Sequence, residues 1–201
     1  MIDPQSVPGF LSDEEGRALA DAARRLGALG PIVEIGAYCG RSAIYMAPAA
    51  KEAGAVFASV DHHRGSEEHQ PGWEWHDPAL WDEAAGAIDT LPVFRDTLRR
   101  AGLEDAVVAI VGESAKAASL IASPLGMVFI DGGHALNTAL SDWRAWAGKI
   151  APGGELAVHD VFERPQEGGR PPCEIYKMAV ASQLFAPARE VGALRFLTRL
   201  G

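Results

Sequence analysis

The sequence predicts a single α/β domain over residues 1–201, built on a doubly wound, mostly parallel sheet with a terminal antiparallel strand. Short apolar runs of strand length alternate with amphipathic helical segments, which is typical of βαβ units in a parallel sheet. The first strand runs straight into a glycine-rich turn and a new helix, IVEIGAYCGRSA. With 201 residues, of which 48% are hydrophobic, the chain can bury one full-size core.

The N-terminal segment 1–30 is expected to cover the sheet. Its residues 1–11 are extended and interrupted by proline. Ser12 and Glu15 have the spacing of a capping box, which predicts a helix over 13–27 that ends at glycine.

Five strand–helix units follow this segment. We expect strands over 32–35, 56–61, 107–111, 127–130 and 155–158. We expect helices over 41–53, 79–101, 115–122, 135–149 and 174–185, the second of them interrupted near Pro92. The last two strands, 189–191 and 194–198, should close the sheet as an antiparallel pair.

Composition limits the classes of partner. A net charge of −9 and a pI near 5.1 disfavour a nucleic acid and suit a small neutral substrate or a cationic cofactor. No apolar run reaches transmembrane length, and no signal pattern opens the chain, so we expect no membrane partner. Cys39 and Cys173 form no metal pattern, which indicates a reduced, cytoplasmic protein.

The glycine turn after the first strand is the first candidate ligand site. Gly36 and Gly40 let the backbone come close to a ligand, and the amides of the following helix point outward. Their spacing is neither the GxGxxG of dinucleotide-binding folds nor the GxxxxGK[ST] of phosphate loops. Taken alone, the turn is equally consistent with an ordinary strand-to-helix connection.

Asp61 ends the second strand, which reads VFASVD. A carboxylate in this position can accept hydrogen bonds from both vicinal hydroxyls of a ribose. Nicotinamide-dependent enzymes place an acid there too, so Asp61 alone does not identify the cofactor. A strand-end cap is the simpler alternative.

The segment 62–82 is expected to be an insertion that acts as a lid. It holds four histidines and three tryptophans but little aliphatic core material. Because aromatic side chains gain by burial, this composition argues against simple disorder. Trp73 and Trp75 are expected to stack on adenine or sugar faces, and His63 is a candidate substrate contact. A metal site, a surface loop or a contact between two copies of the chain are the alternatives.

Acidic residues and histidines follow the fourth and fifth strands. IDGGH brings Asp131 and His134 to the end of the fourth strand, and the fifth ends in His159 and Asp160. Because neighbouring parallel strands end at one edge of a sheet, these side chains should converge. Two carboxylates with imidazoles make a metal site, a general base or both. Oxygen ligands suit Mg²⁺, whereas an imidazole ligand moves the preference toward Mn²⁺, Fe²⁺ or Zn²⁺.

Together these motifs resemble the class I S-adenosylmethionine-dependent methyltransferases, whose first motif reads E/D-x-G-x-x-x-G. FLSDEEG, VEIG, VD, IDGGH and PGG-x-x-x-x-HD span nearly the whole chain and look like metal-dependent small-molecule O-methyltransferases of the macrolide-sugar and methylmannose polysaccharide type. The resemblance implies a Rossmann-like methyltransferase sheet, S-adenosylmethionine as cofactor, and a divalent metal, Mg²⁺ with Mn²⁺ as the second choice.

The resemblance also implies which residues bind the cofactor. In the family, the residues after the third strand meet the adenine, although Ser114 is equally suited to cap a helix. The implied cofactor-binding residues are Glu34, Gly36, Tyr38, Gly40, Ser42, Asp61, His62, Glu113, Ser114 and Asp131.

The relatives bind Mg²⁺ through the aspartate of a D-x-x-H motif and an acidic pair after strand five, and the motif's histidine is their general base. Carried over, Asp131 and Asp160 become metal ligands, and His134 becomes the base and a substrate contact. This chain departs from the relatives at His159, where they often have an acid. His159 is therefore either the third ligand or a hydrogen-bonding neighbour, and His134 has a helix cap as its alternative role.

The expected reaction transfers a methyl group to a small-molecule hydroxyl. The sulfonium methyl is already an activated electrophile, so the enzyme has to ready a hydroxyl and align it. His134, whose ordinary pKa is about 6.5, can take the proton near neutral pH. A diol could chelate the metal, and the aromatic insertion favours a sugar over a catechol. The segment 161–173 is expected to be an active-site loop.

Two other functions compete with this hypothesis. A nicotinamide-dependent oxidoreductase is disfavoured because GxGxxG is missing and because Tyr176 and Lys177 are adjacent, not spaced as Tyr-x-x-x-Lys. A non-catalytic cofactor-binding protein would not need Asp131, His134 and Asp160 to converge. The aromatic insertion also makes a homodimer an expectation to test.

Overall fold

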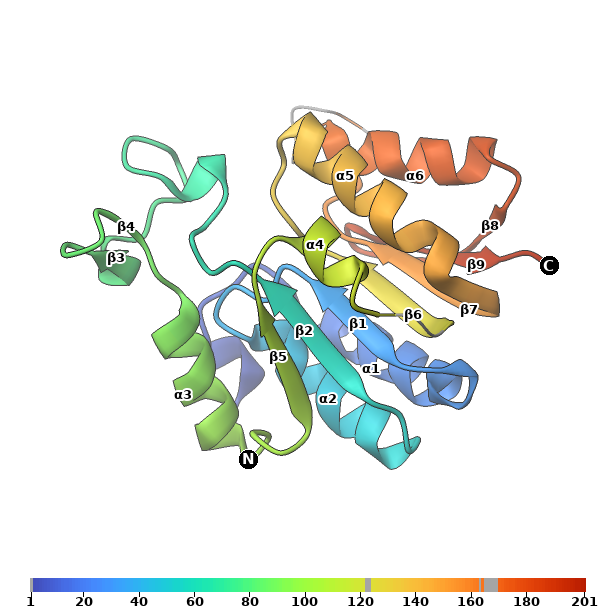
Figure 1. Cartoon of the computed structure of the whole chain (residues 1–201), viewed down its shortest axis with the longest axis horizontal. Helices are drawn as coiled ribbons and strands as arrows, with labels where there is room; N and C mark the ends of the chain where they lie inside the picture. The colour runs from blue at the N-terminus through green and yellow to red at the C-terminus, as the bar shows by residue number, and fades with distance from the viewer. Residues whose placement is uncertain (1, 122–123, 163, 165–169) are drawn as a thin grey trace.

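A seven-stranded sheet runs through the molecule (Figure 1). The computed structural model describes residues 2–121, 124–162, 164 and 170–201. The strands of this sheet are β1 (Ile32–Ile35), β2 (Phe57–Asp61), β5 (Val107–Val111), β6 (Leu125–Ile130), β7 (Ile150–Val158), β8 (Phe185–Val191) and β9 (Leu194–Arg199). Their order is β5-β2-β1-β6-β7-β9-β8, and neighbours from β5 to β7 pair in parallel, so the predicted doubly wound sheet is confirmed.

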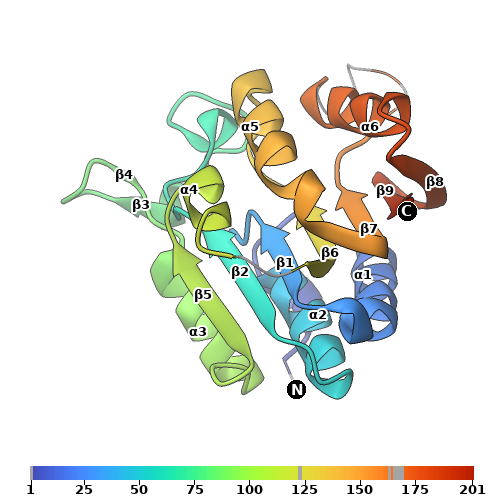
Figure 2. The same ribbon diagram turned by 45° about the vertical axis from the view of Figure 1, so that its right-hand side comes forward.

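Helices cover both faces of the sheet. Their bounds are α1 (Asp13–Leu26), α2 (Arg41–Glu52), α3 (Leu91–Ala101), α4 (Ser114–Ala118), α5 (Leu136–Trp146) and α6 (Pro171–Ala181). Figure 2 shows α1, α2 and α3 on one face and α4, α5 and α6 on the other. Within the described residues, no helix combines the length and the apolarity that crossing a membrane requires.

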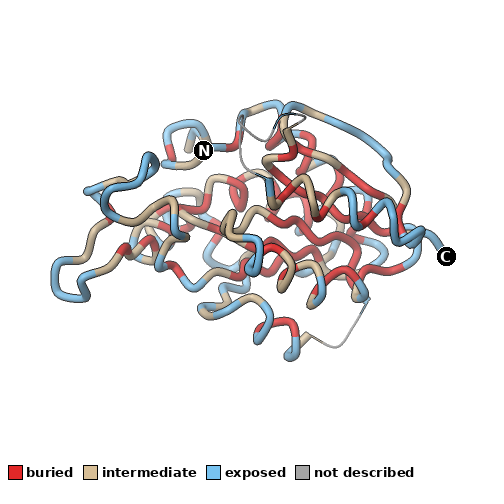
Figure 3. Tube along the Cα trace, turned by 90° about the horizontal axis from the view of Figure 1, so that it is seen from above, coloured by how far each residue is buried: buried red, intermediate tan, exposed pale blue. Residues whose placement is uncertain are grey.

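Two hydrophobic cores lie on opposite faces of the central strands. Ile32 joins the core under α1 to α3, whereas the next residue, Val33, joins the core under α4 to α6. Side chains alternate between the faces of a strand, so a strand buried on both sides is apolar at every position. The buried residues accordingly run through the middle of the molecule (Figure 3).

The last two strands form an antiparallel pair, as predicted. β9, the terminal strand, runs antiparallel to both β7 and β8. β8 lies at the edge of the sheet next to β9, and because it is antiparallel to β9 it has the same direction as β7. The turn at Gly192, where φ is +55°, reverses the chain and inserts β9 between β7 and β8.

The predicted helix over 79–101 is wrong in its first half, because α3 begins at Leu91. Pro92 lies in the first turn of α3, where a missing N–H costs nothing. The Asp82 carboxylate accepts hydrogen bonds from the amides of Ala84 and Ala85, which fixes a turn instead of a helix. The segment before α3 contains a 3-10 turn (Pro78–Leu80) and a small hairpin of β3 (Trp81–Asp82) and β4 (Ala87–Ile88).

Other element ends shift by several residues. β7 begins at Ile150 and includes the Pro-Gly-Gly turn predicted to precede it. α4 ends at Ala118, short of the predicted 122, which itself lies outside the described residues. α6 spans Pro171–Ala181, earlier than predicted, because Pro171 and Pro172 fit a first helical turn. Of the predicted loop 161–173, residues 163 and 165–169 lie outside the described residues.

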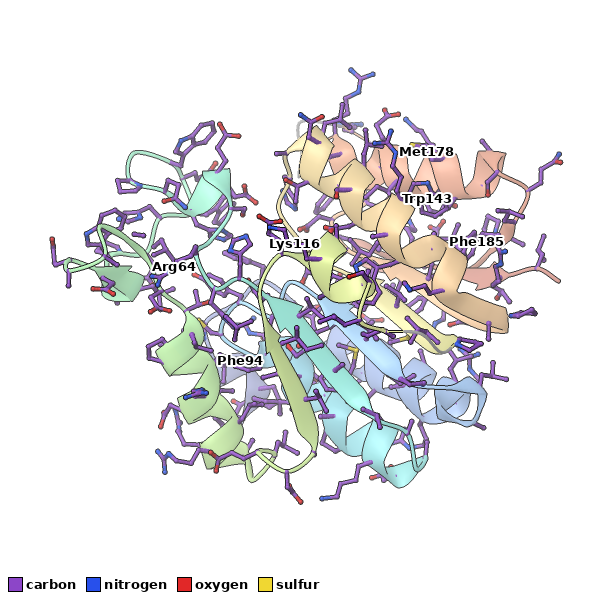
Figure 4. All side chains as sticks on the ribbon, viewed as in Figure 1. Arg64, Phe94, Lys116, Trp143, Met178 and Phe185 are labelled. Carbon is purple, nitrogen blue, oxygen red and sulfur yellow. The ribbon has the colours of Figure 1, made fainter. Side chains whose placement is uncertain are left out.

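Phe94 tests the packing between α3 and the insertion. Its fully buried ring lies on α3 (Figure 4), with its centroid 5.0 Å from that of His63. Phe94→Ala removes these contacts and leaves a cavity, so we expect the free energy of unfolding to fall by about 3–5 kcal/mol. Urea denaturation measures it. Phe10→Ala, at an exposed phenylalanine, is the control and should cost less than about 1 kcal/mol. Equal losses in the two variants would contradict this account.

Candidate active site

The carboxyl ends of four adjacent strands form one edge of the sheet. In the order β2-β1-β6-β7, the paired residues Val60, Ile35, Ile130 and Val158 stand side by side. The residues after them are therefore neighbours in space. Three non-glycine residues just after these strands have a positive φ: Tyr38 after β1, His63 after β2 and Asp160 after β7. Such strained conformations concentrate at functional sites.

The glycine turn is held in place by close backbone contacts. Gly36 has a φ of +91°, and a Cβ at this position would overlap the carbonyl of Asp131. On the other side, one oxygen of the Asp61 carboxylate accepts hydrogen bonds from the amides of Ala37 and Tyr38, both at 2.9 Å. The turn is thus fixed from β6 and from β2 together.

The first cavity, of about 450 Å³, opens along this edge between the glycine turn and helices α4 and α5. Of the predicted cofactor-binding residues, those that line it are Gly36, Tyr38, Asp61, His62, Glu113, Ser114 and Asp131. Gly40 does not line the cavity but is the N-cap of α2, with a φ of +90°. The structure thus brings most of the predicted set together around one space.

Glu34, another predicted cofactor-binding residue, does not line the first cavity. The side chain is fully buried behind the turn, where its two oxygens accept hydrogen bonds from the hydroxyls of Ser42 at 2.7 Å and Ser59 at 2.6 Å. Burial raises the pKa of Glu34 to about 7. Its position supports the turn from behind, and Ser42, which borders the second cavity, directs its hydroxyl to Glu34.

Asp142 is a residue of the first cavity that the sequence analysis missed. It is buried on α5, and burial raises its pKa to about 6. It lies three residues after Ala139 and four before Trp146, both of which are buried. An acid on the buried face of a helix is the signal that could have identified it.

The second cavity, of about 630 Å³, lies under the N-terminal segment and the insertion. His134 and Asp160 line it, as do Phe10 and Trp75. The residues shared by the two cavities are Gly36, Tyr38, His69, Asp131 and Gly132. A ligand in the first cavity therefore meets a ligand in the second at the glycine turn.

The insertion contributes aromatic rings, but not all of those predicted. Trp75 packs edge-on against Phe10 with ring centroids 5.2 Å apart, and half of its surface stays exposed. Trp73 is 55% exposed and lines neither cavity. His63 is buried, with its Nδ1 2.7 Å from the Thr90 hydroxyl, and also lines neither cavity. The geometry therefore gives His63 a packing position, because Thr90 and Phe94 surround its ring.

Two carboxylates and two histidines converge where β6 and β7 end. His159 Nδ1 lies 3.0 Å from Asp131 Oδ1 and 3.4 Å from Asp160 Oδ2. His134 Nε2 lies 3.1 Å from the same Asp160 oxygen. His134 Nδ1 is 3.9 Å from Glu68 of the insertion. The predicted convergence is present.

The charges of this cluster stabilise one another. Burial opposes a charge on His159, but Asp131, Asp160 and Glu15 together hold the pKa of its imidazole well above the ordinary value. The hydrogen bond to Asp160 likewise raises the pKa of His134. Although burial favours its neutral form, the two histidines keep the pKa of Asp160 below its usual range.

Asp131, His159 and Asp160 also fit a divalent cation. Each offers one donor atom, and these atoms lie within 4.8 Å of one another. Two carboxylate oxygens with one imidazole nitrogen suit Mn²⁺, Fe²⁺ or Zn²⁺ at least as well as Mg²⁺. The imidazole can serve as a ligand only through a deprotonated nitrogen, so protons and a cation compete for this cluster.

Residues 33–161 match the profile of a protein family described as a methyltransferase domain. This span begins in β1 and ends just after Asp160. It therefore contains the glycine turn, the ends of β1, β2, β6 and β7, and the cluster of carboxylates and histidines.

Several solved structures share the fold. The O-methyltransferase TomG from Streptomyces achromogenes, involved in tomaymycin synthesis and solved with SAM, has a TM-score of 0.65 at 19% identity, covering 96% of this chain and 82% of its own. The SAH-bound methyltransferase PaMTH1 from Podospora anserina has a TM-score of 0.68 at 14% identity, with 96% and 80% covered. The O-methyltransferase NovP has a TM-score of 0.69 at 16% identity, with 94% and 80% covered.

Gly36→Ala tests the contact that closes the turn. A left-handed backbone costs a residue with a Cβ about 1–2 kcal/mol, and here the Cβ also meets the Asp131 carbonyl. Gly54→Ala is the matched control, because φ is +71° there and nothing lies within 4 Å of the added atom. We expect Gly36→Ala to lower the free energy of unfolding clearly more than the control, as measured by urea denaturation. Equal losses would show that the turn can move away from β6.

Proposed function

The chain belongs to the methyltransferase domain family and has the class I fold of S-adenosylmethionine-dependent enzymes, and on that premise we propose that it methylates a hydroxyl of a small molecule. A sugar hydroxyl is the favoured acceptor. The observation that carries the proposal is the meeting of the two cavities at Gly36, Asp131 and Gly132, directly beside His134. Membership of a methyltransferase family argues against both alternatives, the nicotinamide-dependent oxidoreductase and the non-catalytic cofactor-binding protein.

S-Adenosylmethionine would occupy the first cavity. Asp61 already accepts three backbone hydrogen bonds, from Ala37, Tyr38 and His63. A carboxylate has about four acceptor sites, so capacity for a ribose hydroxyl is left. Glu113 and Ser114 border the end of the cavity where the adenine is expected, and the methionine end would lie along the shared wall at Gly36 and Asp131.

The acceptor would enter the second cavity, where the aromatic side chains of Trp75 and Phe10 form part of the lining and would contact the apolar side of a sugar. TomG and NovP are O-methyltransferases, which supports an oxygen acceptor. The N-terminal segment 1–30 would act as a cover, because Pro8 and Leu11 also line this cavity, and the insertion 62–82 would act as a lid.

His134 would be the general base. It faces the second cavity and is held by Asp160 on one side. His134 would take the proton of the acceptor hydroxyl as the oxygen attacks the methyl carbon. The carbon–sulfur bond breaks, its electron pair stays on sulfur, and S-adenosylhomocysteine leaves.

Asp131, His159 and Asp160 would hold a divalent cation, Mg²⁺ or Mn²⁺. A cation bound there would supply Lewis acidity that lowers the pKa of the acceptor hydroxyl. Asp131 lies on the wall that both cavities share, so these residues would also fix the acceptor oxygen near the transferred methyl group.

Two further proposals concern the setting of the enzyme. The cysteines Cys39 and Cys173 are free, which supports a reducing cytoplasmic location. Exposed aromatic side chains at Trp73 and Phe10 support a homodimer formed over the insertion.

Calorimetric titration tests the proposed function. S-Adenosylhomocysteine is titrated into EDTA-treated protein, and the titration is repeated with Mn²⁺ present. In a parallel assay, the protein is incubated with S-adenosylmethionine and a panel of sugars and catechols, with and without Mn²⁺, and methylated product is measured by mass spectrometry. We expect cofactor binding in every condition, and methylated product only when a cation and an acceptor are both present. Absence of S-adenosylhomocysteine binding would overturn the proposal, and cation-independent product formation would remove the cation from it.

The pH dependence of kcat tests His134 as the base. The neutral imidazole is the active form, and Asp160 raises its pKa above the ordinary 6.5. We therefore expect kcat to fall as the pH drops through the pKa of His134. His134→Gln should lower kcat by about 10²–10⁴-fold and abolish this limb, while S-adenosylhomocysteine affinity stays unchanged. A variant that keeps the acid limb would assign it to another group.

A further inference from the structure

Glu15 occupies a buried position next to the cluster that the sequence pattern does not indicate. The spacing of Ser12 and Glu15 predicts only a capping box, and that box is present at the start of α1. However, the side chain of Glu15 is 5% exposed and extends beyond the cap to the end of β7. Its Oε2 lies 3.5 Å from His159 Nε2.

The imidazole of His159 is held from both sides. Its Nε2 faces Glu15, and its Nδ1 faces Asp131 and Asp160 at 3.0 and 3.4 Å. The ring itself is 4% exposed and packs edge-on against Phe129 with centroids 6.4 Å apart. Only Nδ1 is therefore directed toward the carboxylates that fit a cation.

The carboxylate of Glu15 is in turn fixed by three donors. Its Oε2 accepts hydrogen bonds from the Ser12 amide at 3.0 Å and the Ser12 hydroxyl at 2.7 Å. Its Oε1 accepts one from the Ala193 amide at 2.8 Å, in the turn between β8 and β9. A Cβ at Gly192 would lie 2.5 Å from this oxygen, so the turn closes directly onto the carboxylate. These contacts hold the carboxylate of Glu15 next to His159.

We propose that Glu15 is the positioning residue of the cation site: it accepts the Nε2–H of His159 and so leaves the Nδ1 lone pair for a cation held between His159, Asp131 and Asp160. The proposal rests on the cation site of the proposed function. A histidine that binds a metal through one nitrogen commonly donates the other N–H to a carboxylate, which fixes the tautomer and the ring orientation. The N-terminal helix would then be part of the cation site as well as a cover.

Glu15→Gln is the sharpest test, because it keeps the size of the side chain and replaces one acceptor oxygen with a donor. Mn²⁺ is titrated calorimetrically into EDTA-treated, dialysed protein without an acceptor, and S-adenosylhomocysteine affinity is measured on the same samples. We expect the Mn²⁺ dissociation constant of Glu15→Gln to rise about 10–100-fold, with S-adenosylhomocysteine affinity unchanged within about twofold.

Ser12→Ala is the matched control for the loss of the capping box. It removes a hydroxyl from Glu15 and from the helix start but leaves the contact between Glu15 and His159. We expect its Mn²⁺ affinity to stay within about threefold of the wild type, even where its thermal midpoint falls as much as that of Glu15→Gln. Equal loss of Mn²⁺ affinity in both variants would overturn the proposal, because it would trace the effect to the cap.

The outcomes separate this inference from the function on which it rests. Wild-type affinity in Glu15→Gln, together with Mn²⁺ binding by the wild type, overturns the role of Glu15 alone. A wild-type protein that binds S-adenosylhomocysteine but no Mn²⁺ overturns the cation site and the role of Glu15 together. His159→Ala should lose Mn²⁺ affinity at least as far as Glu15→Gln.

Discussion

The packing of the Gly36 backbone on the carbonyl of Asp131 is the contact on which the rest of the site depends. It brings the turn after β1 against the end of β6, and both residues line both cavities. Asp61 holds the same turn from β2 through two amide hydrogen bonds. Because neither contact needs a ligand, the wall where donor and acceptor would meet is already formed. Such preorganisation lowers the entropy that alignment would otherwise cost during reaction.

Compensation of buried charge is the second constraint. Two acids that face a histidine have lowered pKa values: His159 and Ser12 outweigh the effect of burial and lower the pKa of Glu15 to about 2, and His134 and His159 keep the pKa of Asp160 below its usual range. Glu34 has only hydroxyl partners, and burial instead raises its pKa to about 7. The contrast follows from the cost of an isolated charge in a low-dielectric interior. The acids next to histidines can therefore stay charged in the site, whereas Glu34 supports the glycine turn through hydrogen bonds from two hydroxyls.

Much of the fold could be predicted because its signals are local. The capping box at Ser12 joins residues three positions apart, and the apolar strands and the glycine turn are each recognisable from a run of a few residues. The predictions that were wrong concern segments whose structure depends on distant partners. The residues before α3 form a turn and a hairpin whose Leu80 and Ile88 pack in a small cluster with Cys39 and Ile44, and periodicity does not encode this packing. Composition makes Trp73 and His63 candidate substrate contacts, but it cannot place their side chains: Trp73 is exposed, His63 is buried, and neither lines the two cavities.

The sequence by itself determined the order of strands and helices, the glycine turn, and the set of acids and histidines at the strand ends. Only the tertiary structure decided which of them meet. The sheet order puts the ends of β6 and β7 side by side, and the insertion of β9 next to β7 brings the turn at Ala193 onto Glu15. The physical reason is range: periodicity and capping act along a few residues, whereas Glu15, His159 and Ala193 approach one another only after the sheet and α1 have packed.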